Sequence, residues 1–482
     1  MATATKGSEA ADATESARET MRRLHRAPEP EVVATLLPAA TLDQAARKRV
    51  EARALAMLAE LRAAQKTGWV NQFLQEYRLN SSEGVALLSL AEAFLRVPDP
   101  DTADALIADK LGTGDWRAHA GRSNSGLVNS ATWGLVIGRA LVSESEQASA
   151  LKKLIARAGE PFVRQAVGAA MRIMGEIFVM GRTIGEALER MRRDEHGGFT
   201  ASFDMLGEAA RTFPDAERYF AAYAHAIEAV GAAGGNHSVS VKLSALHPRY
   251  EVAHHERCVP ALIERVEALA ETARKAGIAL TVDAEESTRL EMSLDIFEAV
   301  ARAPSLGGWN GLGLAVQAYG KRARPVVAWA EALAAEIGRT VTVRLVKGAY
   351  WDNEIKQTQE EGLENYPLFT RKAATDLCYL ACVRDLLAAK HLYPAFATHN
   401  ARTVATILEL ADGRRDFEFQ RLHGMGEGLF EHLVREEGHA CRIYAPVGGH
   451  RDLLAYLVRR LLENGANSSF VHQLADEKLS DA

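Results

Sequence analysis

"TVTVRLVKG", residues 340–348, has the pattern of a short buried strand, because β-branched and aliphatic residues fill it and Gly348 ends it. Runs of the same kind recur along the second half of the chain, at 199–208, 238–245, 278–285, 311–318, 393–400, 417–424 and 441–448. Amphipathic helical stretches lie between them, such as 259–276, 287–303, 322–337, 372–390 and 401–412. Eight strands that are each followed by a helix predict a closed parallel (β/α)8 barrel.

An open, doubly wound sheet is the alternative arrangement of these elements. It is less favoured, because the chain lacks the glycine-rich first turn that nucleotide-binding sheets of that kind carry. We place the barrel at 196–471 and a tail at 472–482. An all-helical region is expected at 41–195, and an N-terminal segment, partly disordered over its first twenty residues, at 1–40.

Composition narrows the class of protein. A chain of 482 residues with 48% hydrophobic and 25% charged residues is typical of a globular protein, and its net charge of −6 gives no reason to expect nucleic acid. The first residues lack the apolar core of a signal peptide, and the most apolar stretch, 127–142, is too short to span a membrane. Four cysteines without a zinc pattern favour reduced core thiols, no metal site and a cytoplasmic location.

Unusual polar residues fall at the ends of the predicted strands, where (β/α)8 barrels form their active sites. They are Asp204, Glu208, Lys242, Asp283, Gln317, Arg344, Lys347, Thr398, His399, Asn400, Gln420, Arg421, His423 and Tyr444. Singly, each has an ordinary structural explanation: Asp283 can begin a helix, and a histidine such as His399 is more often a core residue than a base. Together they favour a site, and its several cations predict a ligand with negative charge.

Two adjacent arginines, Arg459 and Arg460, lie in the middle of the apolar helical stretch "YLVRRLLENGANSSF" (456–470). Burial of guanidinium groups is costly unless an anion meets them. One solvated arginine and one paired with Glu463 is the simpler explanation. The functional explanation is that both arginines bind an anionic ligand.

Six motifs carry a family resemblance: "SVKLSALHPRY", "TVDAEE", "VRLVKGAYWDNEIK", "FATHN", "FEFQRLHGMGE" and "YLVRRLLENGANSSF". Together they resemble the proline dehydrogenase domain of the bacterial bifunctional proline utilization flavoenzymes (PutA). The resemblance implies a distorted barrel with non-covalent FAD that oxidises L-proline to Δ1-pyrroline-5-carboxylate, the first step of proline catabolism to glutamate. Hydride would pass from proline C5 to flavin N5, and electrons then to a membrane quinone. A cytoplasmic enzyme with peripheral contact at the inner face of the cell membrane is implied.

The resemblance also implies roles for individual residues. The implied FAD-binding residues are Asp283, Gln317, Arg344, Lys347, Gly348, Ala349, Trp351, Thr370, Arg371, Lys372, Thr398, His399, Asn400, Gln420, Glu463, Ser469 and Phe470. The implied proline-binding residues are Lys242, Asp283, Tyr350, Leu422, Tyr444, Tyr456, Arg459 and Arg460, of which Lys242, Asp283, Tyr350, Arg459 and Arg460 are the catalytic set. Glu208 would close over the substrate as a gate by pairing with Arg459. The proline carboxylate would then be the anion of the two arginines.

The chain differs from the full-length family in two respects. Those proteins continue into a covalently linked aldehyde dehydrogenase half, so we expect a truncation point in the tail at 472–482. Some also begin with a DNA-binding ribbon-helix-helix, which residues 1–40 do not match, so no nucleic-acid partner is expected. Two other functions stay open: a Schiff-base aldolase with Lys242 or Lys347 as nucleophile, and a non-catalytic scaffold or DNA-binding fragment.

Overall fold

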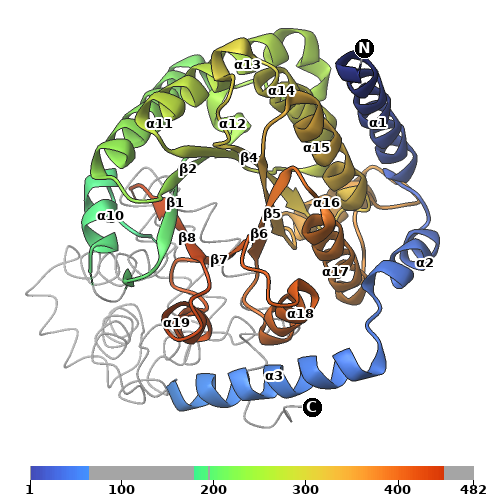
Figure 1. Cartoon of the computed structure of the whole chain (residues 1–482). Coiled ribbons are helices and arrows are strands. Elements are labelled where there is room, and N and C mark those ends of the chain that lie inside the picture. The colour runs from blue at the N-terminus through green and yellow to red at the C-terminus, as the bar shows by residue number, and fades with distance from the viewer. Residues whose placement is uncertain (1, 65–178, 194–195, 450–482) are drawn as a thin grey trace, which may run out of the picture. The chain divides into compact units, whose positions relative to one another are not determined.

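The computed structural model describes residues 2–64, 179–193 and 196–449 (Figure 1). The chain divides into two units, of which the first comprises Met1–Leu58 and Thr183–Val447. The second unit comprises Ala59–Arg182 and Gly448–Ala482 and lies almost wholly outside the described residues. The sequence-based boundaries placed 41–58 in a separate helical region, whereas these residues belong to the unit of the barrel.

Eight parallel strands close into a barrel in chain order (Figure 1). They are β1 (Thr200–Met205), β2 (Ser238–Val241), β3 (Ala279–Val282), β4 (Leu312–Gln317), β5 (Val341–Val346), β6 (Leu392–Ala397), β7 (Glu418–Leu422) and β8 (Cys441–Val447). The ladder between β1 and β8 closes the ring, with Ser202 opposite Tyr444. The closed barrel predicted from the sequence is confirmed, and the open sheet is excluded.

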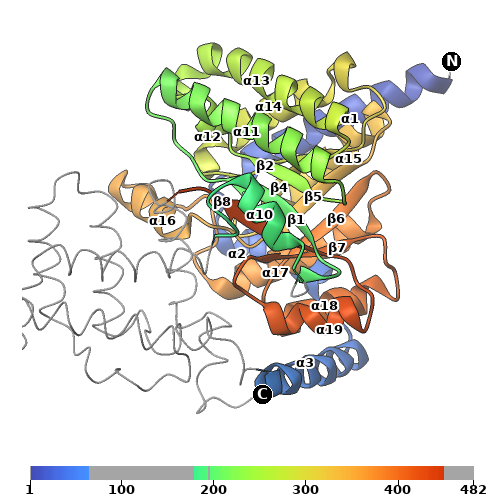
Figure 2. The same cartoon turned by 90° about the vertical axis from the view of Figure 1, so that its left-hand side faces the viewer.

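Helices surround the strands, as Figures 1 and 2 show. They are α10 (Ile184–Met191), α11 (Phe213–Ala233), α12 (Leu243–Leu246), α13 (His255–Ala276), α14 (Leu290–Ala301), α15 (Ala323–Ile337), α16 (Trp351–Glu360), α17 (Lys372–Ala388), α18 (Ala401–Ala411) and α19 (Glu427–Arg435). Their apolar stripes face the strands: in α13, Leu262, Val266 and Leu269 are fully buried. Local signals set their ends, such as the capping box of Thr212 and Asp215 at the start of α11. The last predicted helix, within 453–462, lies outside the described residues.

Residues 2–64 form three helices: α1 (Ala2–Leu24), α2 (Glu29–Ala40) and α3 (Gln44–Ala64). A helix therefore stands where the sequence analysis expected disorder in the first twenty residues. Tertiary packing explains the difference, because Arg18 is buried over the Trp329 ring, 5.0 Å from its centroid. Arg18 also forms ion pairs of 3.0 Å with Asp295 and Glu298 on α14. In α3, Val50 and Ala54 pack against Ala405 of α18.

The four cysteines, Cys258, Cys378, Cys382 and Cys441, are free and buried, as predicted for core thiols. Burial raises the pKa of the Cys441 thiol to about 12, which makes it a poor nucleophile at neutral pH. No helix within the described ranges is long and apolar enough to cross a membrane.

Candidate active site

A polar network fills the barrel lumen at the carboxyl ends of the strands. Side chains of a strand alternate between its two faces, so Ser202 and Asp204 of β1 point inward together. Ser240 of β2 and Lys242, which follows that strand, do the same. The Ser202 and Ser240 hydroxyls lie 2.8 Å apart. Barrel lumens are usually packed with branched aliphatic residues, so polar side chains in this place indicate a site.

Arg344 on β5 is the centre of this network. Its Nε donates to Gln420 Oε1 at 2.6 Å, and its Nη1 donates to Asp283 Oδ1 at 2.6 Å. Its Nη2 donates to the hydroxyls of Ser202, at 3.0 Å, and Ser240, at 2.9 Å. The residue is only 3% exposed, and groups on four other strands or strand ends fix its guanidinium.

Lys242 forms the second part of the network. Its Nζ lies 2.6 Å from Asp204 Oδ2, 3.2 Å from the Tyr444 hydroxyl and 3.4 Å from Asp283 Oδ2. The Tyr444 hydroxyl donates to Asp283 Oδ2 at 2.7 Å. Burial alone would lower the pKa of Lys242, but the carboxylates of Asp204 and Asp283 raise it well above its ordinary value. Lys242 is therefore an ammonium at neutral pH.

The charges of this network cancel, since Lys242 and Arg344 face the carboxylates Asp204 and Asp283. Lys347 likewise forms an ion pair with Asp376 at 2.5 Å. The expected excess of positive charge at the strand ends is thus wrong for these residues, because each cation has a carboxylate partner. Asp204 Oδ1, however, has no hydrogen-bond partner in the part of the chain that the structure describes.

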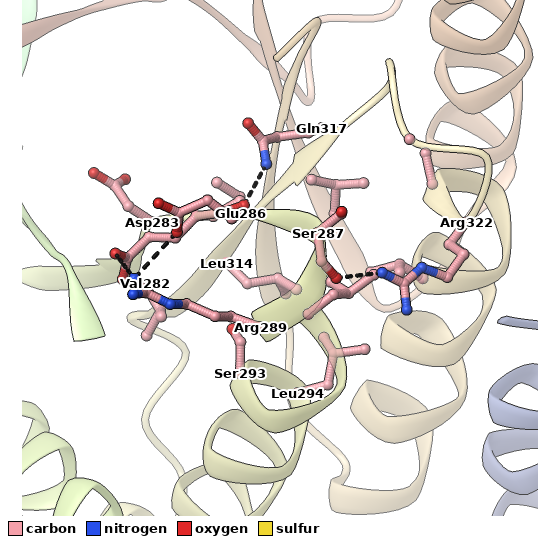
Figure 3. Close-up of a pocket in the computed structure, with 18 of the residues that line it drawn as sticks. Val282, Asp283, Glu286, Ser287, Arg289, Ser293, Leu294, Leu314, Gln317 and Arg322 are labelled. Carbon is pink, nitrogen blue, oxygen red and sulfur yellow. Dashed lines mark hydrogen bonds and ion pairs between the residues drawn. The ribbon is translucent and has the colours of Figure 1, made fainter. Parts of the chain in front are cut away.

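Gln317 joins the ends of β3 and β5, and Figure 3 shows it beside Asp283 and Glu286. Its Nε2 donates to the backbone carbonyl of Glu285 at 2.8 Å, and its Oε1 accepts from Ala349 N at 3.1 Å. The adjacent Gly348 has φ 145°, and a Cβ there would lie 2.4 Å from the Tyr319 ring. Only glycine allows this approach.

Tyr350 and Trp351 follow directly on the same loop. Tyr350 is 8% exposed, whereas the Trp351 ring is partly open at 39%. The indole Nε1 of Trp351 donates to Phe369 O at 2.9 Å, which ties the start of α16 to the segment before α17. An accessible aromatic surface therefore stands beside Lys347 and Gly348.

The N-terminus of α17 is rich in predicted cofactor-binding residues. Lys372 shares the Asp376 carboxylate with Lys347, at 2.7 Å, and Arg371 is the N-cap without a side-chain capping bond. Thr370 donates from its N and Oγ1 to Glu29 of α2, at 2.9 and 2.8 Å. Helix N–H groups with Arg371 and Lys372 beside them form a donor set suited to phosphate. The residues thus fit the phosphate end of a dinucleotide.

The ends of β6 and β7 contact each other through two residues that were each predicted for the site. His399 Nε2 accepts from Leu422 N at 3.0 Å. Thr398 N donates to Gln420 O at 3.3 Å, and Asn400 caps α18 by accepting from Thr403 N at 3.0 Å. These residues therefore hold the loops of the mouth in place.

Two strand-end residues do not join the site. Arg421 lies over the Phe199 ring, 5.1 Å from its centroid, and His423 packs edge-on against His196. The reason is strand alternation: Gln420 and Leu422 face the lumen, so residues 421 and 423 face the outer layer. Burial and nearby arginines lower the pKa of His423 well below its ordinary value.

Several members of the network were not predicted from the sequence or were predicted without a role. Ser202, Asp204, Ser240, Glu285, Asp376, Glu418 and Arg442 belong to this set. Their signal was spacing by two: Ser202–Asp204, Ser240–Lys242, Glu418–Gln420 and Arg442–Tyr444 each place two polar side chains on one strand face.

Six predicted residues lie outside the described residues: Tyr456, Arg459, Arg460, Glu463, Ser469 and Phe470. Glu208 lies half-buried in the loop after β1, and its pairing with Arg459 stays a prediction. Residues 2–64, 179–193 and 196–449 contain no group of three side chains placed to hold a metal ion.

A pocket opens beside the network, between the ends of β3 and β4 and helices α14 and α15 (Figure 3). Asp283, Glu286, Arg289, Gln317 and Arg322 contribute its polar wall. Apolar side chains such as Leu294 and Leu314 line the rest (Figure 3). A concave site with mixed walls is the usual form of a small-molecule pocket.

Family models match three parts of the chain. One described as proline dehydrogenase matches residues 187–473. One described as the proline utilization A proline dehydrogenase N-terminal domain matches 15–62, and one described as the DNA-binding domain of proline dehydrogenase matches 69–178. That last description runs against the expectation that the chain has no nucleic-acid partner, which stays a prediction.

Individual relatives agree. The bifunctional protein PutA of Escherichia coli is 49% identical over 94% of this chain, which spans 36% of that protein's length. Proline dehydrogenase 1 of Bacillus subtilis is 28% identical over 62% of this chain and 90% of its own. A crystal structure of proline utilization A from Bradyrhizobium japonicum superposes with a TM-score of 0.73 at 49% identity, over 95% of this chain and 47% of that one.

Proposed function

The chain belongs to the proline dehydrogenase family, and on that premise we propose that its barrel oxidises L-proline to Δ1-pyrroline-5-carboxylate with FAD. The observation that carries the proposal is the buried Asp283 carboxylate, which is shared by Arg344, Tyr444 and Lys242 at the mouth of the barrel. Such a network fixes substrate-facing groups before a substrate arrives.

The residues of the mouth fit a flavin cofactor. Arg344, Gln317 and Gly348 would hold its ring system, and Arg371 and Lys372 at the start of α17 would meet its phosphates. When bound, FAD supplies a ring that accepts two electrons as a hydride. The family is flavin-dependent in general, and FAD in particular is our inference from the family resemblance, which the phosphate-binding donor set supports.

The oxidation removes a hydride from proline C5 and a proton from the ring nitrogen, and a C=N bond forms between these atoms. The protein must therefore orient the ring and exclude water rather than supply a strong base. Lys242 is held as an ammonium, so it serves as a fixed charge that orders Asp283 and Tyr444. An ammonium cannot attack a carbonyl carbon, which argues against the Schiff-base aldolase with Lys242 as nucleophile.

The substrate's carboxylate needs positive charge beyond the described network, because Lys242 and Arg344 are already balanced by Asp204 and Asp283. Two forked guanidiniums meet that need, and we assign them to Arg459 and Arg460. Glu208 would close the pocket by pairing with Arg459. Both assignments rest on the family resemblance of the segment that contains the arginines.

The electron acceptor and the partners follow from the same premise. We infer that electrons leave to a membrane quinone, with the protein at the inner face of the membrane. The E. coli relative is named bifunctional, and we propose a covalently linked aldehyde dehydrogenase half for the full-length protein. The chain matches a model described as DNA-binding over 69–178, so a gel-shift titration in moderate salt should accompany the enzymology. Sequence-specific binding there would contradict our expectation of no nucleic-acid partner.

A spectrum tests the proposal most directly. The purified protein should be yellow, release FAD on denaturation and lose its flavin absorbance when proline is added without oxygen. NAD should be neither required nor reduced. Asp283→Asn, which keeps the shape and removes the charge, should slow this bleaching by about hundredfold because positioning contributes effects of that size. A colourless protein that cannot be reconstituted with FAD and that borohydride traps on a carbonyl substrate would instead be an aldolase.

A further inference from the structure

The loop after β1, which carries Glu208, has a conformation that the chain does not adopt without support. Gly207 has φ 149°, and a Cβ there would lie 2.2 Å from the Tyr219 ring. Ala209 has φ 50°, in the left-handed region that few residues other than glycine enter. Glu208 stands between these two positions. A strained loop persists only where neighbouring groups hold it.

Ser244 at the start of α12 provides that support with two different atoms. Its Oγ accepts from Ala209 N at 3.0 Å, and its backbone carbonyl accepts from Ala210 N at 2.8 Å. Ser244 is 3% exposed and lies two residues beyond Lys242. Its position therefore sets both the loop of Glu208 and the backbone next to the lumen lysine.

Glu285 in turn fixes Ser244. Its Oε1 accepts from Ser244 N at 2.9 Å, and its Oε2 pairs with Arg289 Nη1 at 3.3 Å. The Glu285 side chain is 6% exposed. The Glu285 backbone carbonyl accepts from Gln317, whose amide also binds Ala349 N. Figure 3 shows the bonds from Gln317 and Arg289 to this segment. One hydrogen-bonded chain thus joins the loops after β1, β2, β3 and β5 through Gln317, the last residue of β4.

We propose that Glu285 is a positioning residue, which holds the loop of Glu208 in register with the cofactor-side loop at Ala349 through Ser244 and Gln317. The proposal rests on the proposed function, since it gives the loop of Glu208 a part in proline binding. Glu285 itself need not touch the substrate. Its role is to keep the loop of Glu208 and the loop of Ala349 at a fixed spacing.

Hydrogen–deuterium exchange tests the contact without any turnover. In Ser244→Ala and in Glu285→Ala, backbone amides of segment 206–212 should exchange about three- to tenfold faster, the effect of one lost hydrogen bond. Glu285→Gln keeps an acceptor oxygen and should restore the rate to within about twofold. A matched control exists at the opposite end of the barrel, where Ser305 Oγ donates to Glu267 Oε1 at 2.6 Å. Ser305→Ala should leave segment 206–212 unchanged, and equal exchange in Ser244→Ala and wild type overturns the proposal.

Kinetics on the FAD-loaded protein test the consequence. Glu285→Ala should raise the KM for proline about three- to tenfold, with kcat within about twofold and the bound flavin per chain unchanged. Glu285→Gln should recover the wild-type KM, which a purely structural defect would not predict. Faster exchange with an unchanged KM overturns the positioning role. If wild type itself fails to be reduced by proline, the proposed function fails, while the exchange data still decide whether Glu285 and Ser244 hold the loop.

Discussion

Two buried ionic networks share the barrel lumen, one at its base and one at its mouth. At the base, the start of β8 carries Arg442 and the start of β7 carries Glu418, which pair through Nε and Nη2 at 2.8 and 3.1 Å. Arg442 Nη1 also donates to Asn236 O at 2.6 Å. Gln420, one pleat above, donates to Glu418 Oε1 at 2.7 Å and accepts from Arg344 of the mouth. The two networks are thus continuous.

They differ in how completely their hydrogen bonds are satisfied. Every nitrogen of the Arg442 guanidinium has an acceptor, and both Glu418 oxygens are occupied. At the mouth, Asp204 Oδ1 has no hydrogen-bond partner among the described residues. Burial and the nearby Asp283 also raise the pKa of the Asp204 carboxyl group. A fully paired network stabilises a fold, whereas an unsatisfied buried group needs a functional reason. Residue types alone would not separate these two networks.

The largest expected effect comes from breaking the base. Glu418→Ala leaves Arg442 buried without a counter-ion, and the free energy of unfolding should fall by about 3–5 kcal/mol. The KM for proline in the protein that stays folded should change little, because Glu418 lies away from the mouth. Chemical denaturation beside steady-state kinetics measures both quantities.

A double variant provides the control for that experiment. Glu418→Leu combined with Arg442→Met removes both charges and keeps the volume, so most of the lost stability should return. If the double variant is as unstable as the single one, the base contributes specific hydrogen bonds rather than charge balance. A raised KM for proline in Glu418→Ala would instead show that the network at the base also contributes to substrate binding.

Features set by the local sequence could be predicted, whereas features that depend on tertiary packing could not. Strand order, the barrel and most mouth residues follow from local periodicity and from where strands end. Arg421 was misassigned because a single strand end does not tell which face each residue takes. Helix α1 was missed because its helicity depends on a buried Arg18 packed on distant Trp329. Charge balance at the mouth depends on Asp376 and Asp204, and only the fold brings these residues to their cations.

A second prediction tests the mouth through pH. Burial and the nearby Glu286 raise the pKa of Glu285 to about 7, against the hydrogen bonds of Ser244 and the charge of Arg289. Among the described residues Tyr250 also faces Glu285, and burial together with the charge of Glu285 raises the pKa of the Tyr250 hydroxyl well above its ordinary value. The pKa of Glu285 is higher in the folded protein than in the unfolded chain. The contribution of Glu285 to the free energy of unfolding is therefore complete below about pH 4.5 and is lost as the pH rises through about 7.

Glu285→Gln removes this titration. Relative to wild type, the variant should gain stability between pH 5 and pH 8, by no more than about 3 kcal/mol for a shift of this size. Denaturation curves of both proteins across that range measure the difference. Parallel profiles would mean that Glu285 titrates normally in the folded protein.

A third prediction concerns Arg460, which lies outside the described residues. If it forks onto the proline carboxylate, Arg460→Met removes a charge-assisted bond of about 1.5–3 kcal/mol, or roughly ten- to hundredfold in kcat/KM, with most of it in KM. Arg460→Lys should rescue only in part, because an ammonium lacks the planar fork. A normal KM with a lowered melting temperature would make Arg460 a structural residue like Arg442.

The smallest expected effect on stability is at Asp376, because its ion pairs are much more exposed to solvent than those at the base of the barrel. Its carboxylate is shared by Lys347 and Lys372, and the three side chains are 37%, 28% and 44% exposed. Burial alone would raise the pKa of Asp376, but the two ammonium groups lower it. Ion pairs this open contribute less than about 1 kcal/mol each, so Asp376→Asn should hardly change the free energy of unfolding.

The substitution should act on cofactor affinity instead. Removing an anion beside a phosphate site raises the local positive potential, so the FAD dissociation constant should fall about two- to threefold at low salt, and the gain should fade as salt screens it. Asp385→Asn is the matched control, since Asp385 pairs with Arg324 at 2.7 Å near the other end of α17. Its FAD affinity should equal that of wild type. Weaker FAD binding in Asp376→Asn would show that the carboxylate orients the two lysines, because geometry would then outweigh the added charge.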